Sequence, residues 1–223
     1  MRRVALVALV VLALAVTSGY AATDQILEGM GQKAVRGVVN IVTSPLEVPM
    51  QILKGYDKGL DFIGNEPASR GVGAVLGIFR GIGHAAGRLA WGGLELVGFW
   101  TANPADNVGV GIPFDAEYAW QEGQQYSIFK PDFEEGIKPV TNKLAHGVAD
   151  ALLGIAEVPS QVKLGKDEGN AAKGFVRGLW FWASREVYGF GNVLTCIVPN
   201  PTDNPGYSFN TPWPWTGLTE SLK

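Results

Sequence analysis

An internal duplication constrains the fold of this chain more than any other feature of its sequence. At a shift of 110 positions, residues 33–59 align with 143–169, and ten of the 27 aligned positions are identical. At a shift of 97, residues 77–107 align with 174–204, with ten identities in 31 positions. Ordinary residue usage gives about two matches in a window of this size. The sequence therefore predicts two diverged copies of one structural unit.

Both copies contain the same order of expected elements: a helix, a Glu-Val-Pro turn, a second helix, a longer glycine-rich helix and an Asn-Pro-x-Asp-Asn stop. Two copies are too few for a solenoid, which needs three or more repeats. We therefore expect a mainly α fold with two pseudo-symmetric helical units. The expected parts are a signal peptide at 1–21, a first unit at 28–112, a linker at 113–137, a second unit at 138–205 and an extended Pro/Trp-rich tail at 206–223.

The N-terminal residues have the three parts of a secretory signal: Arg2 and Arg3, an apolar run at 4–16, and small residues before Ala22. The apolar run spans about 20 Å as a helix, which is shorter than the roughly 30 Å hydrocarbon core of a bilayer. This length favours cleavage, after Ala21, over a permanent anchor. We expect the chain to be exported.

Composition excludes several classes of function. Without Arg2 and Arg3 the chain holds 16 basic and 21 acidic residues, a net charge of −5, so a nucleic-acid partner is not expected. Cys196 is the single cysteine and has no partner for an internal disulfide. Stability must therefore come from packing, from partners or from a membrane.

The long glycine-rich helix of each copy is expected to be amphipathic. At about 100° per residue, Arg80, Arg88 and His84 fall on one side of the first-copy helix. The apolar side chains fall on the opposite side: Ile78, Ile82, Leu89 and Leu96. Arg177 and Arg185 repeat the charged side in the second copy. We expect the charged side to be solvated or paired, and the apolar side to be buried.

Glycines recur every four residues beside the charged side, at Gly73, Gly77 and Gly81 and again at Gly174 and Gly178. Each glycine inside a helix costs about 1 kcal/mol relative to alanine, so a series of them indicates that another backbone approaches closely. The expected cause is a helix crossing.

The Glu-Val-Pro-x-Gln motif occurs once in each copy and has two interpretations. It is either helix punctuation, with Ser44 as the N-cap, Pro45 in the first turn and Glu47 as the capping carboxylate, or a motif that binds a partner. The residues that carry the motif or the charged helix side are the candidate interaction residues: Glu47, Pro49, Gln51, Arg80, Arg88, Glu157, Pro159, Gln161, Arg177 and Arg185.

No catalytic motif is recognisable in this sequence. His84 and His146 lie far apart, and neither has a nucleophile or carboxylate at a known motif spacing. We therefore expect no catalytic, cofactor or metal site and a protein that is not an enzyme. One enzymatic alternative stays open, a hydrolase with an unrecognised site that uses Asp106 and Asp203.

The chain resembles the small secreted proteins associated with exosortase systems in Gram-negative bacteria. The resemblance covers residues 33–104 and rests on the signal peptide and on a set of residues and motifs: Lys33, Arg36-Gly37, Asn40, Thr43, Pro45, Glu47-Val48-Pro49, Gly77, Arg80, Arg88, Gly92, Thr101 and Pro104. Proteins of this group usually contain a single unit, so the duplication is a departure. The resemblance implies export to the periplasm or outer envelope and a link to surface-protein sorting and exopolysaccharide production.

The leading hypothesis is an exported, non-enzymatic envelope protein, periplasmic or bound to a membrane surface, whose partners are envelope proteins or an exopolysaccharide. A second hypothesis is a membrane-inserting helical oligomer that packs through its glycine faces, while Arg80, Arg88, Arg177 and Arg185 line a polar interior.

Overall fold

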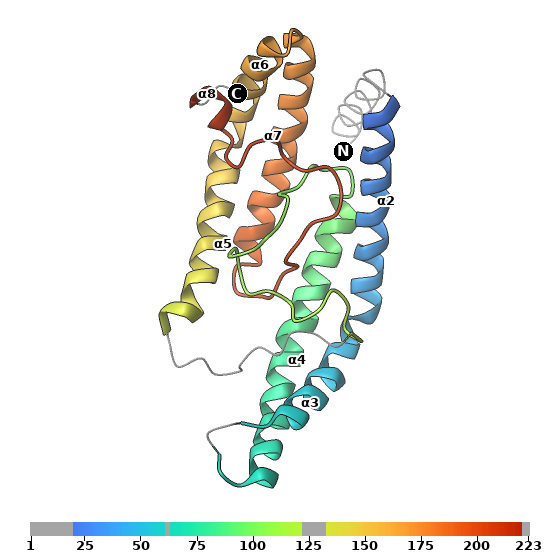
Figure 1. Ribbon diagram of the computed structural model, residues 1–223, viewed down its shortest axis with the longest axis vertical. Coiled ribbons are helices and arrows are strands. Elements are labelled where there is room, and N and C mark those ends of the chain that lie inside the picture. Colours follow the sequence, from blue (N-terminus) through green and yellow to red (C-terminus); the bar gives the residue numbers. More distant parts are fainter. Residues whose placement is uncertain (1–19, 61–62, 122–132, 220–223) are drawn as a thin grey trace.

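The protein is mainly α, as the sequence predicts. A computed structural model describes residues 20–60, 63–121 and 133–219 (Figure 1). Its helices, in chain order, are α2 (Tyr20–Thr43), the 3-10 turn η1 (Ser44–Leu46), α3 (Glu47–Lys58), α4 (Glu66–Val97), α5 (Phe133–Leu153), the 3-10 turn η2 (Gly154–Ala156), α6 (Glu157–Asp167), α7 (Ala171–Leu194) and α8 (Thr216–Thr219). The predicted signal peptide, 1–21, lies outside the described residues except for its last two positions.

The helices form two long hairpins. In the first, α2, η1 and α3 run end to end and pack along α4; in the second, α5, η2 and α6 pack along α7. The α3–α4 end and the α6–α7 end lie at opposite ends of the molecule, while α4 and α7 run side by side near its middle (Figure 1). Trp91 of α4 and Tyr188 of α7 meet there, with ring centroids 6.3 Å apart. They belong to a small aromatic core that Phe114 completes.

Two coil segments, 98–121 and 195–215, cross in front of the helices (Figure 1). They pair with each other through isolated bridges, Asn103 with Ser208 and Pro113 with Asn200, and a third bridge joins Asp106 to Asp203. Within the described ranges, the pairing between extended segments consists of these three isolated bridges, and all other regular structure is helical. The molecule therefore has a helical layer with a coil layer on one side.

The helix crossings that the glycine spacing predicts are confirmed. Gly73 of α4 faces Gly55 of α3, and Gly77 faces the backbone of Gln51. In the second hairpin Gly174 of α7 faces the Gln161 carbonyl and Gly165 of α6. In each case a Cβ atom would overlap the facing backbone, so the absence of a side chain at these positions allows the helices of each hairpin to pack closely.

The prediction that the apolar side of each long helix is buried is wrong for the chain by itself. Arg88 is completely buried, whereas Phe79, which lies on the opposite side of α4, is 68% exposed. All four long helices expose apolar side chains in this way: Val35, Val38 and Val42 on α2; Ile78, Phe79, Ile82, Leu89 and Leu96 on α4; Leu144, Val148 and Leu152 on α5; Phe175, Phe190 and Leu194 on α7. The physical reason is that the polar side of each helix makes the internal contacts described below.

The predicted N-cap at Ser44 is also wrong. Ser44 begins the 3-10 turn η1, and its hydroxyl donates to the carbonyl of Ile41 at 2.9 Å. Helix α3 begins at Glu47 without a side-chain cap. Glu47 does not act as a capping carboxylate because an arginine binds it inside the protein.

The segment predicted as a linker, 113–137, is partly built into the fold. Phe114 and Asp115 are buried, and α5 begins at Phe133; residues 122–132 lie outside the described part of the chain. The tail predicted as extended contains the short helix α8, and Trp213 stacks on His146 with ring centroids 4.4 Å apart. Both segments therefore cover the helices.

None of the helices in the described ranges has the combination of length and apolar character that a membrane span requires.

Replacing Gly77 by alanine is expected to destabilise the protein by about 2–3 kcal/mol, because the new methyl group would overlap the Gln51 carbonyl and force α3 and α4 apart. Gly83 lies on the same helix with open space around it, so Gly83→Ala should stabilise the protein by up to about 1 kcal/mol. Urea unfolding measures both effects. An equal response of the two variants would contradict the close crossing.

Candidate functional site

A buried arginine forms the centre of a polar site in the first half of the described chain, residues 20–121. Arg88 of α4 donates through Nε to a Glu47 carboxylate oxygen at the start of α3, and both side chains are fully buried. Its Nη1 donates to Asn40 of α2 at 2.9 Å, and its Nη2 donates to the Ala116 carbonyl at 3.0 Å. Three helices and one coil segment therefore meet on a single guanidinium group.

The second half, residues 133–219, contains the same contacts. Arg185 of α7 donates to Glu157 of α6 at 2.6 Å, to Asp150 of α5 at 2.8 Å and to the Thr211 carbonyl at 2.8 Å. Each arginine also lies over an aromatic ring from the coil. The guanidinium carbon of Arg88 is 4.5 Å from the Phe114 ring centroid, and that of Arg185 is 4.2 Å from the Phe209 ring centroid.

A glutamine one turn after each glutamate extends the network to the coil. The amide of Gln51 donates to Glu47 at 3.0 Å and to Asp115 at 2.9 Å. Gln161 donates to Glu157 at 3.0 Å and to Asn210 at 2.6 Å. The Glu-Val-Pro-x-Gln motif thus supplies two internal polar side chains in each half.

Two buried lysines hold the coil segments at a second point. Lys33 of α2 donates to the Thr101 hydroxyl at 2.8 Å and to Asn103 at 2.6 Å, and Lys143 of α5 donates to the carbonyls of Thr195 and Val198 at 2.6 and 3.1 Å. Burial lowers the pKa of each lysine to about 7. Neither lysine was among the candidate residues, although Lys33 and Lys143 are identical in the sequence alignment of residues 33–59 with 143–169, which was the available signal.

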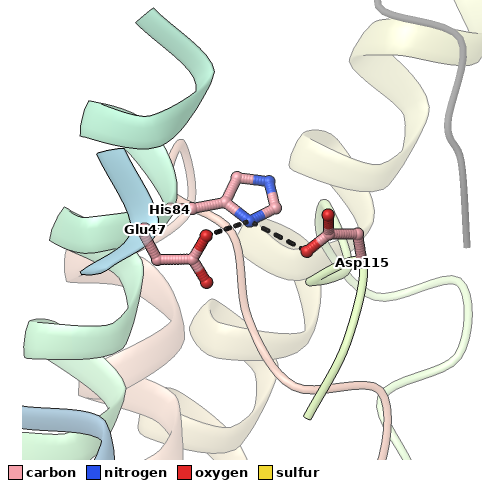
Figure 2. Close-up of side chains that lie close together, drawn as sticks. All are labelled: Glu47, His84 and Asp115. Carbon is pink, nitrogen blue, oxygen red and sulfur yellow. Dashed lines mark ion pairs between the residues drawn. The ribbon is translucent and has the colours of Figure 1, made fainter. Parts of the chain in front are cut away.

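Glu47, His84 and Asp115 form a cluster in the first half alone (Figure 2). The Nδ1 atom of His84 lies 3.9 Å from a Glu47 oxygen and 3.6 Å from an Asp115 oxygen. Burial lowers the pKa of His84 to about 4, and the neutral imidazole dominates at pH 7. Despite its burial, Asp115 has a lowered pKa because Lys54 and Gln51 donate hydrogen bonds to it.

The remaining candidate residues lie at the rim of the network. Pro49 and Pro159 are exposed in the first turns of α3 and α6. Arg80 approaches Asp115 to 3.7 Å, and Arg177 pairs with Glu168 at 3.0 Å. The candidate interaction residues did not include Asn40, Asp115 and Asp150, which contact the central arginines or glutamines. Asp115 lies in a coil segment, which has no sequence period, and the aligned residues Asn40 and Asp150 differ between the two halves.

Two cavities open beside the network. The larger, about 450 Å³, is lined by Arg185, Asp150 and His146 together with coil residues. The smaller, about 170 Å³, is lined by Arg36, Asn40 and the corresponding coil residues. Asp106 and Asp203, the residues of the hydrolase alternative, are brought together by their bridge but are both exposed.

Comparison with protein-family models, curated proteins and solved structures finds no match.

Glu157→Gln is expected to destabilise the protein by about 3 kcal/mol, because it removes one of the two buried carboxylates that bind Arg185 and leaves Asp150 as the other. Glu168→Gln is the matched control: it removes the partner of Arg177 at a partly exposed pair, where the loss should be below about 1 kcal/mol. The free energy of unfolding in urea distinguishes the two. Equal losses would show that burial of the Arg185 pair has no energetic consequence.

The free energy of unfolding should rise between pH 7 and pH 9. Lys33 and Lys143 have a pKa of about 7 in the folded protein and about 10.5 when unfolded, so in this window the unfolded chain binds more protons. Each lysine contributes at most about 1.4 kcal/mol per pH unit. Lys33→Met should show about half of the rise. A flat or falling profile for the unmodified protein would contradict the lowered pKa values.

Proposed function

We propose that this chain is an exported envelope protein that acts by binding, and that it docks onto the surface of a membrane through the exposed apolar side of its helical layer. The observation that carries the proposal is the inverted distribution of side chains, with Arg88 fully buried and Phe79 68% exposed on the same helix. Large exposed apolar patches on soluble monomers are uncommon and mark interaction sites.

The geometry gives the apolar side chains a common direction. Lys33, Arg88, Lys143 and Arg185, one on each long helix, all bind carbonyl or hydroxyl groups of the coil segments. At about 100° per residue, most of the exposed apolar residues lie about 100–180° around each helix from these side chains, so they point away from the coil layer. Such a face suits the boundary between headgroups and acyl chains, where amphipathic helices lie in the plane of the membrane.

The coil-covered side remains available to a second partner. The cavity lined by Arg185, Asp150 and His146 offers both charged and hydrogen-bonding groups, which suits the hydroxyl groups of an exopolysaccharide or a polar segment of an envelope protein. A role within an exosortase system, as the sequence resemblance implies, belongs to this proposal.

We also propose that the two halves derive from duplication of one unit. The support is the recurrence of the contacts at aligned positions: Arg88–Glu47 and Arg185–Glu157, Arg88–Asn40 and Arg185–Asp150. The bridges between Asn103 and Ser208 and between Pro113 and Asn200 tie the coil of each half to the coil of the other.

The alternative of a membrane-inserting oligomer packed through glycine faces finds less support. Gly73, Gly77 and Gly174 already pack within the chain against α3 and α6, so these glycines are not available for contacts between copies. A surface-bound protein and an inserted oligomer differ in extraction, since sodium carbonate releases the former and leaves the latter in the membrane.

Phe79→Gln combined with Ile82→Gln is expected to weaken binding to vesicles of phosphatidylethanolamine and phosphatidylglycerol by about a hundredfold. Both side chains are exposed on α4, and burial of each in the membrane is worth at least about 1.5 kcal/mol. Flotation of the purified protein with vesicles measures the bound fraction. Val108→Gln is the control, since Val108 is exposed on the coil segment. Unchanged flotation of the double variant, or no flotation of the unmodified protein, would overturn the proposal.

A further inference from the structure

We propose that Glu47, His84 and Asp115 form a binding site for a divalent first-row transition metal ion, for which Zn²⁺ is the representative. One ligand atom of each residue lies within 4.8 Å of the others, and all three residues are buried (Figure 2). An imidazole nitrogen with two carboxylate oxygens is a ligand set that Zn²⁺ accepts, with a fourth position open.

Unpartnered atoms around the cluster point to a missing ligand. His84 Nδ1, Asp115 Oδ1 and Gln51 Oε1 are buried and accept or donate no hydrogen bond. His84 is only 4% exposed, and its Nδ1 is directed between the two carboxylates (Figure 2). Such atoms normally have a partner in folded proteins, so His84 Nδ1 and Asp115 Oδ1, which lie 3.6 Å apart, call for an explanation.

The spacing of the ligand atoms requires only small movements. Ligands at about 2.1 Å from a tetrahedral Zn²⁺ lie about 3.4 Å from one another. Nδ1 of His84 is 3.6 Å from Asp115 and 3.9 Å from Glu47. The two carboxylate oxygens lie within 4.8 Å of each other, so each carboxylate would have to move by up to about 0.7 Å to complete the site.

The second half of the chain shows that the fold itself does not require this cluster. Phe181 stands at the position that aligns with His84, and Asn210 takes the place of Asp115 as the partner of the glutamine. Arg185 and Glu157 nevertheless keep the same pair as Arg88 and Glu47. His84 and Asp115 are thus additions to a network that the second half forms without them.

Two positively charged side chains compete with a metal ion for the Asp115 carboxylate, but both can move away from it. Lys54 lies 2.9 Å and Arg80 3.7 Å from Asp115, and their side chains are 23% and 18% exposed, so both can turn toward water. Arg88 is fixed, but it binds Oε1 of Glu47 and leaves Oε2, which accepts a hydrogen bond from Gln51, to face His84. The metal would therefore replace Lys54 and Arg80 as the counter-charge of Asp115.

The competing explanation is a neutral His84 whose Nδ1 carries a proton and donates to the carboxylates. Arg80 Nε, 3.5 Å from His84 Nε2, suits that tautomer. The two explanations differ in one measurable property, which is whether the protein takes up a metal ion.

Isothermal titration calorimetry with Zn²⁺ on the EDTA-treated full-length protein tests the proposal. We expect one equivalent of Zn²⁺ to bind to the unmodified protein and binding to weaken at least tenfold, about 1.4 kcal/mol, in His84→Phe and in Asp115→Asn. Both variants introduce the residue that the second half accommodates, so both should fold. His146→Ala is the matched control for adventitious binding at the other histidine and should bind as the unmodified protein does.

No Zn²⁺ uptake by the unmodified protein, or unchanged affinity and stoichiometry in both cluster variants, would overturn the metal site.

Co²⁺ gives a second readout that needs no variant. Histidine and carboxylate ligands produce d–d bands in the visible spectrum, whereas an intense thiolate charge-transfer band would place the ion at Cys196 and contradict the assignment. Vesicle binding is measured separately, and its outcome does not affect this test.

Discussion

The buried pair between an arginine and a glutamate, Arg88 with Glu47 and Arg185 with Glu157, is the interaction on which the rest of the structure depends. Removing two charges from water costs several kcal/mol per ion, and the cost is offset only when every donor finds an acceptor. Glu47, Asn40 and the Ala116 carbonyl supply those acceptors from three different segments. The arginine therefore requires the helices and the coil to be in place together.

The inverted side-chain distribution follows from this requirement. Because the coil segments supply carbonyl groups to Arg88 and Arg185, the polar side of the helical layer is the side that is covered. The glycines contribute by allowing α3 to approach α4 closely, with Gly73 against Gly55, which brings Glu47 within reach of Arg88. The apolar side chains then have no internal partner and remain on the surface, where a membrane is the proposed partner.

Much of the fold could be predicted from the sequence, because it depends on local and periodic signals. The matching sequence segments, the glycine spacing and the amphipathic pattern indicated the helices and their crossings, and they placed Arg88 and Arg185 on one side of the long helices. Which side lies inside could not be predicted. Amphipathic periodicity shows that two faces differ, but the burial of the charged face depends on coil residues such as Asp115 and Thr211, whose contacts have no sequence period. The same limit hid the cluster of Glu47, His84 and Asp115, since its members lie on two helices and a coil.

The central claim, that the coil-facing side of the long helices is inside and the apolar side is outside, is tested most directly by thiol modification of one phenylalanine on each of α4 and α7. Phe79 and Phe181 lie on corresponding long helices, one 68% exposed and the other completely buried. In a Cys196→Ala background, Phe79→Cys in lipid-free protein should react with a thiol reagent as fast as the urea-unfolded chain, and Phe181→Cys should react far more slowly. A protected Phe79→Cys beside a reactive Phe181→Cys would show that the apolar side lies inside and would contradict the account.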